Sequence, residues 1–543
     1  MTSVVPPPPI APQSTGMLQA PLVSQAPVRR ADAPSRGRGL RAAALAALCL
    51  AGRRPLAELL VVIDNTIVNV AIPTFARDLN ASTTGLQWIV DAYTLAFACL
   101  LLPAGHLGDR IGRRRVLVIG LAAFGVVSGA TALCTTLDAV TTCRALLGIC
   151  AALVYPATLS LIMTTFEGSS RKGLAVGLWA ATSGLGIALG PILGGLLLEH
   201  FSWESIFWVN VPLALITVPA VLVAVPESRS SEKARFDVVG AILSAIGVGA
   251  LVWGIIEGPH RGWTSGSVTT AFIVGAICVS ALVAWELYWP HPLIDVRLFF
   301  RREFSAGAVS IAAAFFALFG FIFIITQYFQ DVRGYSALMA GVATLPFAIV
   351  MAVVSPIASV LSRRLGPGWV VGVGLGIMGL GFWRVTVLEA DSAYWQMIVP
   401  AMVIMAAGLA LVQAPATSAI MGVVRKDQVG AASAMNDTTR EIGGTLGVAV
   451  LGSIVASQFS DSLNSAVSGL MPQQALDQAD NSITAAMTVA KYMPETVQGL
   501  FKEAAVNAFM DTVHQAGWVV ACVAWAGALI AVIALPRGRQ NSV

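Results

Sequence analysis

The sequence predicts an all-α polytopic membrane protein with fourteen spans, arranged as two six-helix halves with two further helices inserted between them. Three observations predict this fold class. Hydrophobic residues make up 56% of the 543 residues and charged residues only 11%, whereas soluble domains carry about 25% charged residues. Apolar segments of membrane-spanning length recur along the chain, and part of the sequence repeats itself. A soluble protein of this composition would precipitate.

A helix needs about 20 predominantly apolar residues to cross a bilayer. We place the first span after Pro55, because an earlier start would hold Arg53 and Arg54 at membrane depth, at a cost of about 2.5–3.5 kcal/mol each. An even number of spans puts both termini on one side. The fourteen expected spans are residues 56–76, 87–105, 115–135, 139–165, 174–198, 206–225, 238–257, 268–289, 304–327, 338–361, 369–388, 396–421, 430–457 and 513–535.

The basic residues assign the two sides. Loops on one side, together with the two tails, hold 25 Lys and Arg residues, against about six on the other side. Cytoplasmic loops carry the excess of Lys and Arg, so we expect both termini in the cytoplasm and the protein in the cell inner (plasma) membrane. Only Arg144 and Arg440 remain inside expected spans. The net charge of +4 gives no indication of a nucleic-acid partner.

Two internal alignments at nearly the same offset support the two halves. Residues 359–370 align with residues 105–116 at an offset of 254, and Leu361, Arg364, Gly366 and Val370 match. Parallel halves with a substrate site between them are an architecture of secondary transporters. A second alignment, at an offset of 257, matches Gly173, Gly186, Gly190 and Gly195 with Gly430, Gly443, Gly447 and Gly452.

These features divide the chain into four regions. Residues 1–55 form a Pro- and Arg-rich cytoplasmic tail, expected to be disordered, with a juxtamembrane helix. Residues 56–230 form the N-terminal half, residues 231–300 hold the two inserted spans, and residues 301–543 form the C-terminal half. Within this last half, a polar, mildly acidic loop at 459–512 is expected outside the cytoplasm.

The stretch between the second and third spans packs four arginines and one aspartate into a very short turn. Its glycines allow the helix ends to approach, and Asp109 offers a carboxylate to a guanidinium group. A plain cytoplasmic loop would explain the positive charge but not the glycine spacing. The residues of this candidate gate are Gly105, Gly108, Asp109, Arg110, Gly112, Arg113 and Arg114.

Three ionisable residues within spans are candidates for proton coupling or substrate binding. Asp64 lies among Val and Ile residues of the first span, where an acid is costly and therefore a functional candidate. Arg144 in the fourth span cannot deprotonate, but it can tune a neighbouring carboxyl group. Asp91 in the second span is the other acid that can meet Arg144. Each residue also has a structural interpretation, as a polar side chain near the membrane–water interface.

Two further helices carry unusual patterns. Arg440 and Glu441 are adjacent in span 13, so they point to different sides of the helix and each needs a partner, in an ion-pair network or a transport site. Small residues every fourth position in span 5 allow close helix packing, and a proline bends the span. These residues are Gly186, Gly190, Pro191, Gly194 and Gly195.

These motifs resemble those of the major facilitator superfamily. Residues 105–116 resemble its loop between spans 2 and 3, Gly-x-Leu-x-Asp-Arg-x-Gly-Arg-Arg. The segment around Asp64 is similar to the first span of the fourteen-span drug:proton antiporter branch, and the surroundings of Arg144 look like the span-4 arginine motif. Residues 184–195 resemble an antiporter motif that symporters and uniporters largely lack. The resemblance covers about residues 56–535.

The resemblance implies the major facilitator fold and proton-coupled efflux of drugs, expected to be amphipathic or lipophilic cations, by alternating-access antiport. In this interpretation Asp64 loads the proton, Arg144 tunes it, and Asp109 latches the inward-closed state. The expected partners are small-molecule drugs, protons and the lipid bilayer, with a monomer as the working unit. No enzyme activity, cofactor or metal is expected, since the proton gradient supplies the energy. The alternative is an exporter dedicated to one metabolite or natural antibiotic.

Overall fold

The computed structural model describes residues 55–79, 83–167, 169, 171–229, 237–290, 292–293, 295–425, 428–467, 476, 479 and 482–536. All of them belong to one unit, Cys49–Val543. The tail and juxtamembrane helix expected at 1–55 lie outside the described residues, apart from Pro55.

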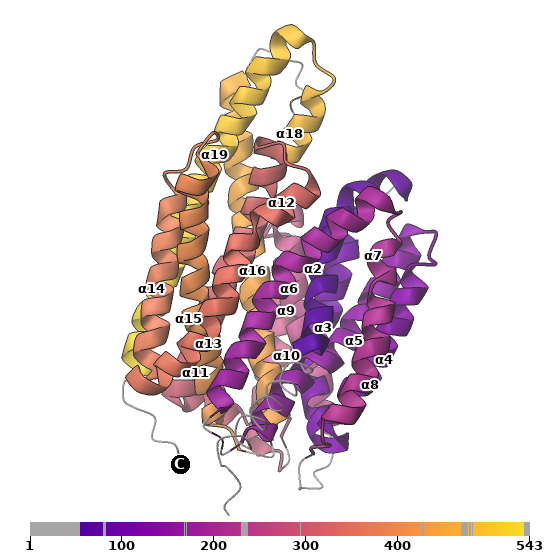
Figure 1. Ribbon diagram of the computed structural model, residues 1–543, viewed down its shortest axis with the longest axis vertical. Helices are drawn as coiled ribbons and strands as arrows, with labels where there is room; N and C mark the ends of the chain where they lie inside the picture. The colour runs from indigo at the N-terminus through magenta and orange to yellow at the C-terminus, as the bar shows by residue number, and fades with distance from the viewer. Residues whose placement is uncertain are drawn as a thin grey trace, which may run out of the picture. The chain divides into compact units, whose positions relative to one another are not determined.

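Across these described ranges the regular structure is helical, with no strand (Figure 1). The first part of the chain comprises α2 (Pro55–Asp78), α3 (Thr83–Ile111), α4 (Arg113–Thr131), α5 (Leu137–Thr165), α6 (Lys172–His200), α7 (Ser205–Trp208) and α8 (Asn210–Ala224). The inserted pair is α9 (Val238–Arg261) and α10 (Gly266–Tyr288). The remainder comprises η1 (Val296–Phe300), α11 (Arg302–Gln327), η2 (Tyr328–Val332), α12 (Ala337–Ala343), α13 (Leu345–Leu365), α14 (Pro367–Val385), η3 (Tyr394–Ile398), α15 (Val399–Gly422), α16 (Val429–Val467), α18 (Ile483–Ala490) and α19 (Glu495–Ala534).

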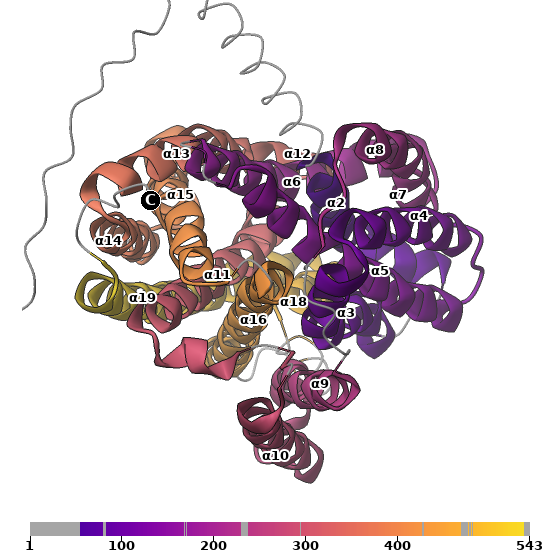
Figure 2. The same cartoon turned by 90° about the horizontal axis from the view of Figure 1, so that it is seen from below.

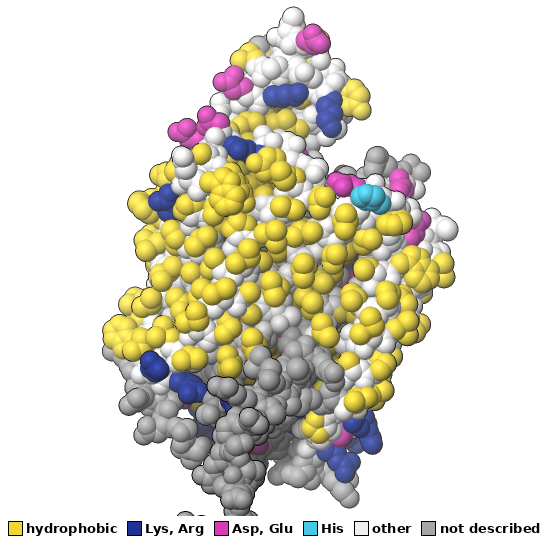
Figure 3. Space-filling view, viewed as in Figure 1, with side chains coloured by type: hydrophobic (Ala, Val, Ile, Leu, Met, Phe, Trp, Pro, Cys, Tyr) yellow, Lys and Arg dark blue, Asp and Glu magenta, His cyan; other side chains and the backbone are white. Residues whose placement is uncertain are grey.

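Thirteen helical segments of the described residues are long and apolar enough to cross a bilayer, from Gly85–Ile111 to Glu495–Ala534. The helix α2 is not among them, so the count of fourteen spans stays a prediction. Figure 3 shows a broad hydrophobic belt between two ends that carry charged side chains, with most of the visible acidic side chains at the upper end. This surface is the one that a multi-pass membrane protein requires.

The structure has two separate apolar cores, one formed by residues that precede the inserted helices in the sequence and one by residues that follow them. One core draws on residues 57–225 and the other on residues 298–535. The halves meet where α6 packs on α12 and α13, and where α16 packs on α3 and α5. The inserted pair lies at the periphery in Figure 2, with α9 against α3 and α16.

The internal repeat appears as two identical helix junctions. Gly112 alone separates α3 from α4, and Gly366 alone separates α13 from α14. Their φ angles are 118° and 88°, in the region that favours glycine. The two glycines stand at the predicted offset of 254, so the weak sequence match reflects a real structural repeat.

The segment at 459–512 is not a simple loop between two spans. Its described residues extend α16 to Val467, form α18, and start α19 at Glu495. Phe459, Phe501 and Phe509 bury their rings there. In Figure 1, α18 and the first turns of α19 lie beyond the ends of the other helices.

The glycines of α6 bring it into close contact with α2. A side chain at Gly186 would lie 2.7 Å from Val62, and one at Gly194 would lie 2.9 Å from Ile67. At Gly190 a Cβ would collide with the Thr66 hydroxyl. On the other face of α6, Gly195 and Pro191 contact α12 of the opposite half. The helix α6 therefore packs tightly against α2 of its own half and against α12 of the opposite half.

We expect Gly190→Ala to destabilise the protein by about 1–3 kcal/mol, because the added methyl group overpacks the α2–α6 contact. Gly376→Ala in α14 is the matched control, since a Cβ there meets nothing within 4 Å. Thermal unfolding of the two purified variants in detergent measures the difference. Equal melting temperatures would contradict the assigned packing.

Candidate functional site

A buried ion pair joins α2 to α5. Asp64 and Arg144 are both fully buried, and Arg144 Nη1 donates to Asp64 Oδ2 at 2.7 Å. Asn210 Nδ2 donates to the other carboxylate oxygen at 2.7 Å and also to Ser128. Arg144 Nε donates to the Ile89 carbonyl at 3.1 Å. Protonation of Asp64 would remove its negative charge and leave the buried Arg144 without a counter-charge. Protonation therefore weakens this ion pair.

Asp91, the other acid proposed to meet Arg144, does not reach it. It is half-buried on α3, where it interacts electrostatically with Glu257 of α9. Glu257 itself pairs with Arg261, one turn further along α9. The structure therefore separates Asp91 from the Asp64–Arg144 pair and places it beside the inserted helices.

A second buried ionic cluster links the two halves. Ser183 Oγ and the Tyr155 hydroxyl donate to Glu58 Oε1, the latter at 3.4 Å. Arg440 Nη1 donates to the Tyr155 hydroxyl oxygen at 3.2 Å, and Asp437 Oδ1 lies 3.7 Å from the same nitrogen. The partners of Arg440 are thus an acid on its own helix, Asp437, and the hydroxyl of Tyr155 in the opposite half.

The sequence interpretation missed Glu58, Tyr155, Asp437 and Asn210. Glu58 and Asp437 are acids inside expected spans, and the cost of such acids is the signal that could have identified them. Tyr155 and Asn210 carry no comparable signal, because their roles depend on contacts between distant helices.

Aromatic rings connect the two ionic clusters. The Arg144 guanidinium lies 4.2 Å from the centroid of the Tyr93 ring. Tyr93 stacks on Phe97 with centroids 6.1 Å apart, and Phe97 meets Tyr155 edge to face at 5.8 Å. A change at Arg144 can therefore reach Tyr155 and Arg440 through direct contacts.

A cavity of about 70 Å³ lies between the halves. Binding pockets for drug-sized ligands have volumes of about 300–1,000 Å³, so the halves must separate before such a molecule can enter. Arg440 and Glu441 both line this cavity, although they are adjacent in sequence. The lining also includes Asn65, Tyr93, Tyr155, Gln413 and Asp437.

The gate residues close one end of the space between the halves. Asp109 accepts hydrogen bonds from Arg113 Nε at 2.8 Å and Nη2 at 2.5 Å. It also accepts from the backbone N–H groups of Gly430 and Ala431, at 2.9 and 3.1 Å. These two groups belong to the first turn of α16, where unsatisfied N–H groups and the helix dipole favour an anion.

Other residues of the motif support this contact. A Cβ at Gly105 would lie 2.5 Å from Ala434, so only glycine lets α3 approach α16 this closely. Arg113 also donates to Ser228, and the backbone N–H of Arg114 donates to Glu227. Arg110 is exposed, and Gly108 borders Arg113 without crowding.

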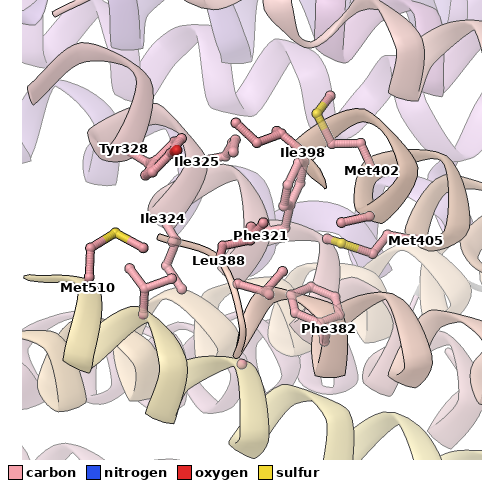
Figure 4. Close-up of a pocket in the computed structure, with 14 residues that line it drawn as sticks. Phe321, Ile324, Ile325, Tyr328, Phe382, Leu388, Ile398, Met402, Met405 and Met510 are labelled. Carbon is pink, nitrogen blue, oxygen red and sulfur yellow. The ribbon is translucent and has the colours of Figure 1, made fainter. Parts of the chain in front are cut away.

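A second cavity lies within the C-terminal half, between α11, α14, α15 and α19 (Figure 4). Its volume is only about 30 Å³, and Phe, Leu, Ile, Val and Met side chains provide most of its walls. The Tyr328 hydroxyl donates to backbone carbonyl groups at Glu389 and Ala390. This cavity is a small packing void in the apolar core, and its lining contains no carboxylate or cationic side chain.

The chain is similar to known membrane transporters over most of its length. The family model of the Major Facilitator Superfamily matches residues 56–448. The chain is 34% identical over 482 residues to the multidrug efflux pump LfrA of Mycolicibacterium smegmatis, covering 89% of this chain and 95% of that protein. It is 33% identical over 486 residues to the tetracenomycin C resistance and export protein of Streptomyces glaucescens, covering 87% and 89%.

A solved bacterial homolog of the human lysosomal transporter Spinster has a similar fold. That structure, in an inward-facing and unoccupied conformation, has a TM-score of 0.56 and 15% identity. The match covers 90% of this chain and 97% of the other. At this identity the likeness concerns the fold alone.

Proposed function

The chain belongs to the Major Facilitator Superfamily, and from this premise we propose that it exports drugs in exchange for protons. It is a multi-pass membrane transporter and not an enzyme. Export is supported by relatives named for multidrug efflux and for export of tetracenomycin C. The proposed substrates are small amphipathic or lipophilic molecules, with cations foremost.

The observation that supports proton coupling is the buried Asp64–Arg144 pair. Arg144 contacts the ring of Tyr93, and Tyr93 lines the cavity. Asp64 takes up the proton, because Arg144 stays charged at every accessible pH. Protonation neutralises the carboxylate and frees Arg144 to change its contacts with Tyr93. Return of the proton down its gradient provides about 2.3 kcal/mol per charge for each 100 mV of membrane potential.

Alternating access follows from the contact between Asp109 and α16. With this contact formed, the halves are closed at the arginine-rich end, which the distribution of basic residues assigns to the cytoplasm. Breaking it opens the cavity to that side. We propose a monomer in the plasma membrane, with both termini cytoplasmic and no cofactor.

Drug-induced proton flux in inverted membrane vesicles tests this function. A broad panel of cationic and lipophilic compounds is added after a pH gradient has been established, and a substrate should collapse the gradient. Failure of every compound would rule out multidrug antiport. Collapse by a single chemical type would favour the alternative, a dedicated antibiotic exporter, which relatives such as the tetracenomycin C exporter also suggest.

A further inference from the structure

The side chain of Arg440 is held between two aromatic rings. Its guanidinium carbon lies 4.6 Å from the centroid of the Trp179 ring on α6 and 4.5 Å from that of Phe315 on α11. Only 4% of the residue is exposed. A cation–π contact uses the positive charge of the guanidinium and leaves its N–H groups available as hydrogen-bond donors.

One edge of this guanidinium has no protein acceptor. Nη1 donates to Tyr155, whereas Nε and Nη2 have no hydrogen-bond partner among the described residues. Asp437 approaches the Nη1 side, at a distance too long for a hydrogen bond. In the gate, Arg113 uses the same two atoms, Nε and Nη2, to bind the carboxylate of Asp109. The open edge of Arg440 is therefore suited to a carboxylate or carbonyl oxygen.

A second unpartnered donor faces the same cavity. Gln413 on α15 is 1% exposed, lines the cavity, and has no partner for its side-chain nitrogen among the described residues. Glu441 lines the cavity as well, and no hydrogen bond to its carboxylate occurs in the described structure. The cavity wall thus offers donors at Arg440 and Gln413, and an acceptor at Glu441.

We propose that this cavity selects aromatic compounds that carry a carboxylate or carbonyl oxygen together with a cationic nitrogen. The oxygen binds the Nε–Nη2 edge of Arg440, assisted by Gln413, and the cationic nitrogen lies towards Glu441. This inference rests on the proposed export function and adds a chemical preference to it. A purely hydrophobic cavity with acidic residues alone would accept lipophilic cations and give no preference for an acceptor oxygen.

Two fluorescent dyes with the same cationic core provide the test. Tetramethylrhodamine carries a carboxylate that tetramethylrosamine lacks. Fluorescence anisotropy with the full-length protein in detergent measures both dissociation constants. We expect the wild-type protein to bind the rhodamine about ten-fold more tightly, since hydrogen bonds to charged groups have effects of this size or more. In Arg440→Gln the preference should fall below about two-fold, through loss of rhodamine affinity.

Three variants separate recognition from folding. Arg440→Gln combined with Asp437→Asn removes both charges of this pair together, so Asp437 is not left as an uncompensated acid, and it should also lose the preference. Gln413→Leu should weaken the preference without altering a charge. Arg384→Gln on α14, outside the cavity lining, should keep it. Unchanged binding of the rosamine shows in each case that the cavity is intact.

An equal affinity of the wild-type protein for both dyes would overturn the inference, and so would a preference that survives Arg440→Gln. In either case, drug-driven proton flux would leave the proposed export function standing. If no panel compound drives proton flux and neither dye binds, the export function itself fails, and the inference fails with it.

Discussion

Asp64→Asn is expected to abolish drug-driven proton flux while the protein still inserts into the membrane. The amide keeps the shape of the carboxylate but cannot take up a proton, and it leaves Arg144 without a charged partner in a fully buried site. We expect the exchange rate in inverted vesicles to fall by at least about 100-fold, the scale of losing a general acid–base group. Drug counterflow, which requires no net proton movement, should continue.

Asp91→Asn is the matched control, because the structure places this second candidate acid beside Glu257 and away from Arg144. Its exchange rate should remain within about three-fold of the wild-type rate, as expected for a group outside the reacting site. An unchanged rate in Asp64→Asn would remove Asp64 from its assigned role. Complete loss in Asp91→Asn, with Asp64→Asn active, would transfer that role to Asp91.

The sequence predicted that these three side chains lie within membrane-spanning segments, but not which neighbouring helix each of them faces. Hydropathy places Asp64, Asp91 and Arg144 inside apolar segments, and the cost of charge in a bilayer marks all three as functional candidates. Which acid faces Arg144 depends on how α2, α3 and α5 are rotated against one another. Contacts between helices set that rotation, and hydropathy does not encode them.

The second ionic cluster escaped prediction for a related reason. Glu58 meets Ser183 and Tyr155, and Arg440 meets Tyr155 from the opposite half of the chain. These contacts join residues 97 to 285 positions apart. Because Arg440 and Glu441 are adjacent in the sequence, we expected them on different sides of the helix. In the structure both residues nevertheless line the same cavity.

The gate motif was predicted more completely, because its pattern is local. A short spacing of glycines, aspartate and arginines indicated close helix ends and an aspartate–arginine pair, and the structure has both. What the local pattern could not indicate is that Asp109 also binds the first turn of α16, more than 300 residues later. In the second copy of the repeat Arg363 stands at the equivalent position, so the described structure has this carboxylate contact on one side of the pseudo-symmetry only.

Asp109→Ala should therefore shift the protein towards the conformation open at the arginine-rich end. The change removes two hydrogen bonds between the halves and two to Arg113, and each bond to a charged acceptor contributes about 1.5–3 kcal/mol. Loss of the two bonds to α16 alone corresponds to at least about a 100-fold change in the ratio of closed to open states.

Spin labels at Ile111 in α3 and Gly422 in α15 can report this change by double electron–electron resonance, in a background without the seven native cysteines. A side chain at Gly422 meets nothing within 4 Å, so the label does not disturb the packing. The wild-type distribution should be dominated by the short distance and that of Asp109→Ala by a longer one. Arg115→Ala, which removes the exposed arginine that directly follows the gate residues, should leave the distribution unchanged, because exposed ion pairs contribute little. If Asp109→Ala retains the short distance, the closure of this end depends on the packing of α3 against α16 at Gly105, and Asp109 is not its latch.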